Sequence, residues 1–280
     1  MIRLENKPMQ QKWLILSAVA CGTFMATLDS SIVNIALPSI TSAFETGIST
    51  SRWVVISYLF SITGLLLFFG KLADVIGRKS IFNLGYVVFT IGSLLCGLSH
   101  NIHQLIFARG FQGLGSAMLM ANGPAVITAA FPANERGKAL GTLAMVVSLG
   151  LGLGPALGGY LVKYFSWPSI FLVNIPFGIL GAILAYKYIP ASISVELIEH
   201  TQHFERERQL PFTVRLQLAM NRMRSFDWFG TALWMVIQIA YSVAIDRDNS
   251  LGMPVALQRI VMFGASGLLV LFIIWELGNK

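Results

Sequence analysis

Long apolar runs separated by polar links dominate the chain. Eight runs are long enough to cross about 30 Å of hydrocarbon as helices, which takes about 20 residues each. They cover residues 13–37, 53–69, 81–98, 105–130, 139–162, 169–188, 228–245 and 255–275. These runs lack the polar–apolar alternation of a membrane barrel strand. The pattern therefore predicts an all-α polytopic membrane protein of about eight spans.

The distribution of basic residues predicts the orientation of the spans. Lys and Arg in short loops favour the cytoplasmic side of a membrane. With the N-terminus inside, fifteen of the 20 basic residues fall on the cytoplasmic side, four fall on the other side, and Arg109 lies within a span. We therefore expect both termini to be cytoplasmic.

Composition agrees with a lipid environment and narrows the function classes. Hydrophobic residues make up 55% of the 280 residues and charged residues 12%, whereas a soluble domain carries about 25% charged residues. The formal net charge of +7 would suggest a nucleic-acid partner for a soluble protein. Here the basic residues lie in links between apolar runs, so we expect the lipid bilayer, and no nucleic acid, as a partner.

Catalytic and metal-binding patterns are not evident in the sequence. Cys21 and Cys96 lie inside apolar runs without Cys or His at ligand spacing, which argues against a disulfide framework and a metal site. His200 and His203 follow Glu199, but not in the order of a zinc protease, so we interpret them as solvated. The sequence presents no nucleophile with a matched base, and we expect no enzyme.

Two charged residues inside predicted spans are the main candidates for chemistry. Asp29 is the one carboxylate within a span, and Arg109 lies in the fourth span with Gln112 three residues later. An Arg at membrane depth costs about 2.5–3.5 kcal/mol, so it should face a partner or a water-filled cavity. Burial disfavours the charged form of a carboxylate, so Asp29 is a candidate proton site and, when ionised, a candidate cation site. The alternative is that Asp29 and Arg109 form only a structural ion pair; Asn34 is a further polar candidate.

A polar link and a glycine-rich span carry further motifs. The 70–79 segment reads Gly70-Lys-Leu-Ala-Asp-Val-Ile-Gly-Arg-Lys79. Its glycines, Gly70 and Gly77, permit a tight turn, and Asp74 can either cap a helix start or pair with Arg78. Arg78 and Lys79 hold the link at the inner face. An ordinary positively charged loop is the alternative interpretation.

The glycine segment, residues 150–159, lies within the fifth span and reads Gly-Leu-Gly-Leu-Gly-Pro-Ala-Leu-Gly-Gly. Gly154 and Gly158 allow close approach of another helix, and Pro155 removes a backbone donor and bends the helix. Gly150 and Gly159 complete the segment. Ordinary helix packing would explain the glycines alone.

These segments together resemble the major facilitator superfamily. The 70–79 segment is similar to its signature loop, although Val75 stands where that loop usually has a basic residue. Residues 105–117 resemble its fourth-helix motif, whose Arg is implicated in proton coupling, and the glycine segment resembles the antiporter motif of drug:proton exporters. Residues 28–38, 167–178, 226–230 and 272–276 resemble signatures of the fourteen-helix exporters (EmrB/QacA-like).

The resemblance implies a domain organisation. It predicts a cytoplasmic N-terminus at 1–12, a six-helix transporter half at 13–189, a cytoplasmic linker at 190–227 and an extra transmembrane helix pair at 228–276, with the second half absent. Alternating access needs two bundles, so we expect that the chain as written does not transport alone, unless it forms a homodimer or meets a separately encoded second half. A truncated reading frame is the plain explanation of the missing half. The basic amphipathic stretch 212–224 either lies on the inner leaflet or is part of a solvated linker.

The resemblance also implies a function. It suggests proton-coupled efflux of amphipathic or cationic drugs across a bacterial inner membrane, with the proton gradient as energy source and no cofactor. Asp29 would be the proton and cation site and Arg109 would bias its charge, both facing a central cavity. The alternatives are a carrier for a metabolite and a membrane subunit that binds a partner without transporting.

Overall fold

The computed structural model describes residues 9–190, 228–244 and 254–278. In these ranges the chain forms nine helices and no strand. The helices are α1 (Met9–Ala43), α2 (Ile48–Ile76), α3 (Arg78–Gly97), α4 (Ile102–Ala130), α5 (Arg136–Phe165), α6 (Ser169–Leu172), α7 (Asn174–Tyr188), α10 (Trp228–Ala244) and α11 (Val255–Gly278). The predicted all-α membrane fold is confirmed, and each predicted span coincides with one helix or, for the sixth, with α6 and α7 together.

Most of these helices could cross a membrane by length and composition. Six segments of the described chain are long and apolar enough, with α6 and α7 counted as one, and α10 is a shorter apolar helix. Helix α4 is not among the six. It carries the polar residues Arg109, Gln112 and Asn122, which are all buried by neighbouring helices. A helix enclosed by protein can therefore be less apolar than one that faces lipid.

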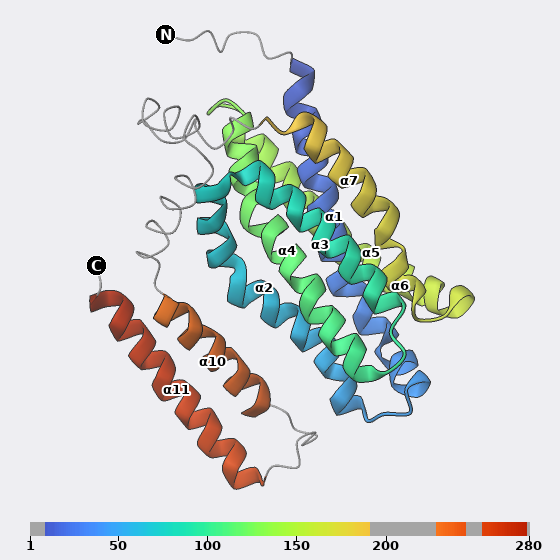
Figure 1. The fold of residues 1–280 in the computed structure, drawn as a ribbon, viewed down its shortest axis with the longest axis vertical. Coiled ribbons are helices and arrows are strands. Elements are labelled where there is room, and N and C mark those ends of the chain that lie inside the picture. Colours follow the sequence, from blue (N-terminus) through green and yellow to red (C-terminus); the bar gives the residue numbers. More distant parts are fainter. Residues whose placement is uncertain (1–8, 191–227, 245–253, 279–280) are drawn as a thin grey trace.

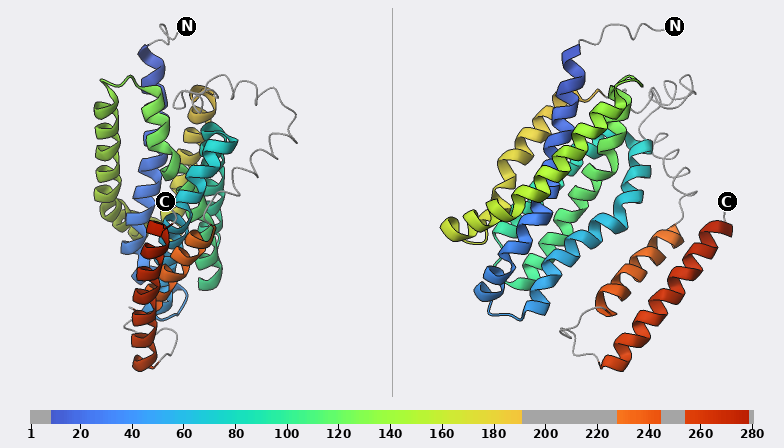
Figure 2. Two further views of the ribbon diagram at one scale, coloured as in Figure 1. Left: turned by 90° about the vertical axis from the view of Figure 1, so that its left-hand side faces the viewer. Right: turned by 180° about the vertical axis from the view of Figure 1, so that it is seen from behind.

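Helices α1 to α7 pack into one bundle (Figure 1). Helix α4 lies along α2 and α3, while α1 lies along α5 and α7 and also contacts α4. Helix α5 forms the outer edge beyond α1, as the side view shows (Figure 2). Helices α1 and α4 therefore meet at the centre of the bundle, where side chains from several helices come together.

The sixth span is interrupted by a proline. Helix α6 ends at Leu172, Val173 intervenes, and α7 begins at Asn174. Pro176 has no N–H to donate to the carbonyl of Leu172, four residues earlier, and a proline ring clashes with that carbonyl in a regular helix. The proline therefore accounts for the break, which was not predicted within the run 169–188, and the break places Asn174 at the start of α7.

One end of the bundle collects basic side chains. Lys12 at the start of α1 pairs with Glu135 at 2.5 Å (Nζ–Oε2), which joins α1 to the link before α5. Lys79 at the start of α3 donates to the carbonyl of Tyr186 near the end of α7 at 2.7 Å. The links that the basic pattern assigns to one side of the membrane thus share one end of the bundle.

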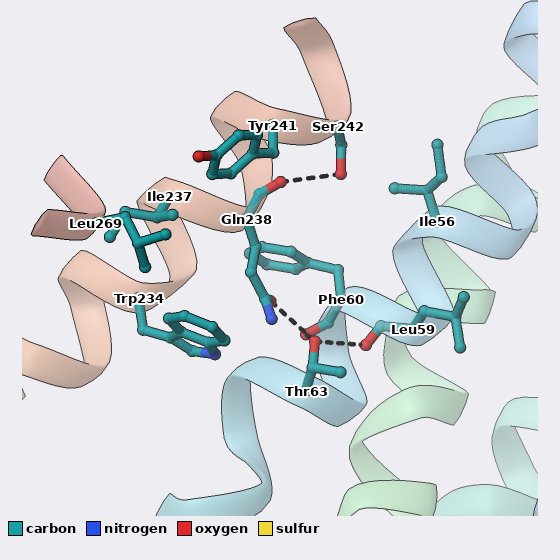
Figure 3. Close-up of a pocket in the computed structure, with 10 residues that line it drawn as sticks. All are labelled: Ile56, Leu59, Phe60, Thr63, Trp234, Ile237, Gln238, Tyr241, Ser242 and Leu269. Carbon is teal, nitrogen blue, oxygen red and sulfur yellow. Dashed lines mark hydrogen bonds between the residues drawn. The ribbon is translucent and has the colours of Figure 1, made fainter. Parts of the chain in front are cut away.

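Helices α10 and α11 form a hairpin beside α2 (Figures 1 and 2). Between the hairpin and α2 lies a groove of about 330 Å³. Across the groove, Oγ1 of Thr63 on α2 donates a hydrogen bond to Oε1 of Gln238 on α10 at 2.8 Å. The rings of Trp234 and Phe60 also line the groove (Figure 3). The predicted linker at 190–227, including the amphipathic stretch 212–224, lies outside the described residues apart from Pro190.

Candidate functional site

Asp29 and Arg109 form an ion pair at the centre of the bundle. Nη1 of Arg109 lies 2.5 Å from Oδ2 of Asp29, and both side chains are fully buried. Asp29 comes from α1 and Arg109 from α4, the two helices that cross in the middle of the bundle. The two charged residues that the sequence singled out as candidates are therefore in direct contact.

Gln112 is held on both sides of its amide. Its Oε1 accepts from Nη1 of Arg109 at 2.6 Å, while its Nε2 donates to Oδ1 of Asp29 at 3.0 Å and to Oγ of Ser93 at 2.8 Å. Gln112 lies three residues after Arg109 on α4, so both side chains project from the same helix face. The amide bridges the ion pair to α3, which contributes Ser93.

Asn174 is a third hydrogen-bond partner of the Asp29 carboxylate. Its Nδ2 donates to Oδ1 of Asp29 at 2.7 Å, and the residue is fully buried at the first position of α7. Its own Oδ1 has no hydrogen-bond partner among the described residues. Asp29 thus accepts from Arg109, Gln112 and Asn174, which come from α4 and α7.

Two aromatic rings and a backbone carbonyl enclose the guanidinium of Arg109. Its Cζ lies 4.0 Å from the ring centre of Tyr58 and 5.5 Å from that of Phe171, and its Nε donates to the carbonyl of Val54 at 3.0 Å. Rings in these positions attract a cation through their electron-rich faces. Nη2 of Arg109 has no partner among the described residues, so one donor of the guanidinium is left over.

The geometry differs from the expectation that Asp29 and Arg109 face an open cavity. Both side chains are enclosed by α1, α2, α4 and α7 in this conformation. Enclosure strengthens the attraction between the charges, but it also removes the hydration that an isolated ion would need. Each charge stabilises the other. If one partner lost its charge, the other would remain as an isolated buried ion, which carries a large desolvation cost.

Asn34, the other polar candidate in the first span, does not join this cluster. Its side chain is exposed, and its Nδ2 lies 3.4 Å from the carbonyl of Ser30, one helical turn earlier. Asn34 lies five residues after Asp29, so it projects from a different face of α1. The first span therefore contributes Asp29 alone to the buried cluster.

The glycine segment lies against α1. A Cβ added to Gly154 would lie 2.5 Å from Cβ of Ser31, and one added to Gly158 would lie 2.9 Å from Cγ1 of Ile32. Gly150 is equally tight against Thr27. By contrast, nothing lies within 4 Å of the corresponding position on Gly159, so the close approach depends on three glycines at four-residue spacing and Gly159 is not part of it.

Ser31 compensates for the missing donor of Pro155. In a regular helix the N–H of residue 155 would donate to the carbonyl of Leu151, but proline has no N–H. Oγ of Ser31 donates to this carbonyl at 2.8 Å. The hydroxyl from α1 thus satisfies the backbone group that Pro155 leaves free on α5, and it joins the two helices next to Gly154.

The 70–79 segment is almost entirely helical. Gly70, Asp74 and neighbouring residues belong to α2, Gly77 alone separates the helices, and Arg78 and Lys79 begin α3. Gly77 has a φ of 109°, which favours glycine, whereas a Cβ on Gly70 would meet nothing within 4 Å. The prediction of a turn at both glycines was therefore wrong for Gly70 and right for Gly77.

The predicted pairing within this segment is present. Nη2 of Arg78 lies 2.9 Å from Oδ1 of Asp74, one helical turn earlier across Gly77. Nη1 of Arg78 also donates to the carbonyl of Ala125 in α4 at 3.4 Å. The segment thus connects the α2–α3 junction to α4, away from the buried pair.

Some members of the cluster were not predicted from the residues. Asn174 had a usable signal, because an amide within an apolar span is costly to bury without a partner. Ser93 and Tyr58 had none, since Ser and Tyr are common in membrane helices. Their contacts depend on the relative placement of helices, which periodicity within one helix does not contain.

Comparisons with known proteins agree with this fold. Residues 19–278 match the family model described as Major Facilitator Superfamily. The chain belongs to the major facilitator superfamily. Its structure is similar to the inward open conformation of the xylose transporter XylE from E. coli, with a TM-score of 0.59 and 17% identity over 84% of this chain and 60% of XylE. A likeness at this identity supports the fold.

Two curated relatives are similar in sequence. The riboflavin transporter RibZ of Clostridioides difficile is 44% identical over 216 residues, which cover 76% of this chain and 47% of RibZ. The multidrug resistance protein Stp of Mycobacterium tuberculosis is 35% identical over 280 aligned positions, gaps included, and the alignment covers 92% of this chain and 51% of Stp. The chain spans about half the length of these relatives.

Proposed function

We propose that this chain is the proton-binding half of an exporter that exchanges protons for amphipathic or cationic drugs. Asp29 is the proton site, and Arg109 sets the balance between its charged and neutral forms. Cationic substrates gain from the ionised carboxylate, and the proton gradient supplies the energy. A second six-helix half completes the transporter, either in the same reading frame, as a separate chain or from a second copy of this chain.

The buried ion pair is the observation that carries this proposal. Asp29 and Arg109 are fully buried and 2.5 Å apart, and charged residues within the membrane mark ion and proton pathways more often than they serve packing. Gln112 and Asn174 complete the hydrogen bonding of the buried carboxylate, so a change in its charge would reach side chains of both α4 and α7. The name of the relative Stp, a multidrug resistance protein, supports drugs as the substrate class.

The test is proton-linked efflux in cells. The full reading frame that contains this chain is expressed in bacteria with low efflux, with a second six-helix half supplied where the frame carries none. Energised cells loaded with ethidium should extrude it, a protonophore should stop extrusion, and Asp29→Asn should abolish it at unchanged membrane abundance. Ethidium efflux that survives Asp29→Asn would place the proton site elsewhere and leave Asp29 as a structural counter-ion.

A second candidate function is carriage of a metabolite such as riboflavin. It is favoured by the 44% identity to RibZ, which exceeds the 35% identity to Stp. Uptake of labelled riboflavin by a riboflavin-requiring strain that expresses the same reading frame distinguishes the two. Riboflavin uptake without ethidium efflux would favour the carrier, and neither activity would favour a membrane subunit that binds a partner without transporting.

The proposal includes a topology. The end of the bundle that carries Lys12, Arg78 and Lys79 faces the cytoplasm, as does the N-terminus, in a bacterial inner membrane. The support is the excess of basic residues on this side. A reporter fused after Lys280 should read as cytoplasmic, whereas a reporter inserted near Ser166 should read as external, and the reverse pattern would overturn this orientation.

A further inference from the structure

We propose that Asn174 senses the protonation of Asp29 by rotating its side-chain amide. This inference rests on the proposed function, because it takes Asp29 as the group that gains and loses a proton. With Asp29 ionised, Nδ2 of Asn174 donates to its Oδ1 at 2.7 Å. With Asp29 protonated, the amide turns by half a rotation, and the carboxyl O–H donates to Oδ1 of Asn174.

An amide suits this task because it offers a donor and an acceptor from one end group. The last side-chain torsion of Asn is broad and roughly two-fold, so the two orientations are close in intrinsic energy. The half rotation exchanges the positions of the nitrogen and the oxygen. Before the rotation Nδ2 faces the carboxylate and Oδ1 has no partner; after it, Oδ1 faces the carboxyl and Nδ2 has no partner. The number of amide atoms without a partner therefore stays the same.

Gln112, the other amide that contacts Asp29, cannot rotate in the same way. Its Oε1 is held by Nη1 of Arg109 at 2.6 Å, and its Nε2 is shared between Asp29 and Ser93. Rotation would place its amide nitrogen against the guanidinium, with two donors facing each other. Oδ1 of Asn174 is buried and has no partner among the described residues, so nothing of this kind holds Asn174 in place.

The other groups that face the carboxylate do not replace Asn174 as an acceptor. Arg109 of α4 has only donors. The hydroxyl of Tyr58 on α2 lies 3.0 Å from the carbonyl of Ala26 and 3.0 Å from Oγ of Ser116, to which its hydrogen bonds are directed. Sγ of Cys96 on α3 lies 3.6 Å from Oε1 of Gln112 and hydrogen-bonds to that amide. Tyr58 and Cys96 are the other titratable groups that interact electrostatically with Asp29 among the described residues.

The position of Asn174 connects this contact to the backbone. Asn174 begins α7 directly after the break at Val173, where Pro176 leaves the carbonyl of Leu172 without its regular helical donor. A residue at such a break can shift without disturbing a complete helical hydrogen-bond ladder. A change in the Asn174 contact therefore reaches the sixth span at its most adaptable point.

Infrared difference spectroscopy on the full chain in lipid nanodiscs tests the inference. The protein is prepared with isotope-labelled asparagine side-chain carbonyls, and spectra are compared across about pH 3 to 9. As the pH falls, the carboxyl band of protonated Asp29 should appear together with a shift of one labelled asparagine carbonyl to lower frequency, because that carbonyl becomes hydrogen-bonded. The reaction consumes one proton from water and needs no other reactant.

Three variants assign the two signals. Asp29→Asn should remove both, and Asn174→Leu should remove the asparagine shift while the carboxyl band remains. Asn122→Leu is the matched control, because Asn122 is equally buried on α4 but donates to the carbonyl of Met118 at 2.8 Å and does not contact Asp29. This variant should keep both signals.

Two results would overturn the inference, and they differ in what they leave standing. If the carboxyl band appears without any shift of a labelled asparagine, or if the shift persists in Asn174→Leu, Asn174 is no sensor while Asp29 remains a proton site. If Asp29 shows no carboxyl band across the whole range, the inference and the proton site of the proposed function both fail. The unsubstituted protein gives this answer even where Asn174→Leu does not fold.

Discussion

The contact between α1 and α5 predicts both the sign and the size of a change in the free energy of unfolding. Two glycines of α5, Gly154 and Gly159, differ in their surroundings. A Cβ on Gly154 would lie 2.5 Å from Cβ and Oγ of Ser31 and 3.1 Å from the backbone nitrogen of Ile32. Carbon atoms in normal contact lie about 3.5–4.0 Å apart, so α1 would have to move by about 1 Å. The Ser31 hydroxyl can rotate away, but its Cβ and the Ile32 backbone cannot.

Gly154→Ala should therefore destabilise the bundle. Overpacking costs about 1–3 kcal/mol, and weakening the Ser31 hydrogen bond to Leu151 adds about 1 kcal/mol. The gain from replacing Gly by Ala within a helix is about 0.5–1 kcal/mol, which leaves a net loss of about 1–3 kcal/mol. The Cβ added by Gly159→Ala would meet nothing within 4 Å, so this variant should show only the increase in helix stability of about 0.5–1 kcal/mol.

The assay is unfolding of the purified chain in mixed micelles by increasing detergent denaturant, followed by circular dichroism. The comparison between the two variants removes the effect of helix propensity, because both make the same chemical change on α5. The difference in the free energy of unfolding should be about 2–4 kcal/mol, the overpacking cost plus the weakened hydrogen bond. Equal effects of Gly154→Ala and Gly159→Ala would refute the close packing of α1 on the glycine segment.

Two further predictions use the same unfolding assay. Arg109→Leu should cost about 3–5 kcal/mol because it leaves the Asp29 charge buried without a partner, and adding Asp29→Asn should recover part of this loss; strictly additive costs would argue against coupling of the two residues. Ser31→Ala should cost about 1 kcal/mol by leaving the Leu151 carbonyl unbonded. In a Pro155→Ala background this cost should vanish, because the restored backbone N–H takes that carbonyl, and an unchanged cost would show that Ser31 acts in some other way.

Much of the bundle follows from patterns within single helices. Apolar length predicted the helices, and the pairing of Asp29 with Arg109 followed from the cost of burying the one carboxylate within a span and the Arg of the fourth span without a partner. Gln112 could be placed with Arg109 from its spacing of three residues on one helix. In each case the information is local, or it follows from the cost of burying a charge.

The parts that were not predicted depend on how helices pack. Asn174 reaches Asp29 because α7 packs on α1, and no periodicity within residues 169–188 contains that contact. Gly70 and Gly159 look like other glycines of their segments, yet a Cβ on either would meet nothing within 4 Å. Asn34 was chosen for its polarity in the first span, but its direction on α1 places it outside the cluster.

Helix α1 carries the buried charge of Asp29 on one side and packs against the glycine segment of α5 on another. A proton on Asp29 would affect these two contacts differently. Its contact with α4 includes the ion pair of Asp29 and Arg109, so neutralising Asp29 removes an attraction there. Close to Asp29, its contact with α5 consists of close glycine packing and the hydrogen bond from Ser31 to Leu151, which contain no charge. A ligand or proton shifts a conformational equilibrium only by its differential interaction with the two states. A proton on Asp29 would therefore act on the side of α1 that faces α4 and α7, whereas the contacts of α1 with α5 at Gly154 and Ser31 would stay unchanged.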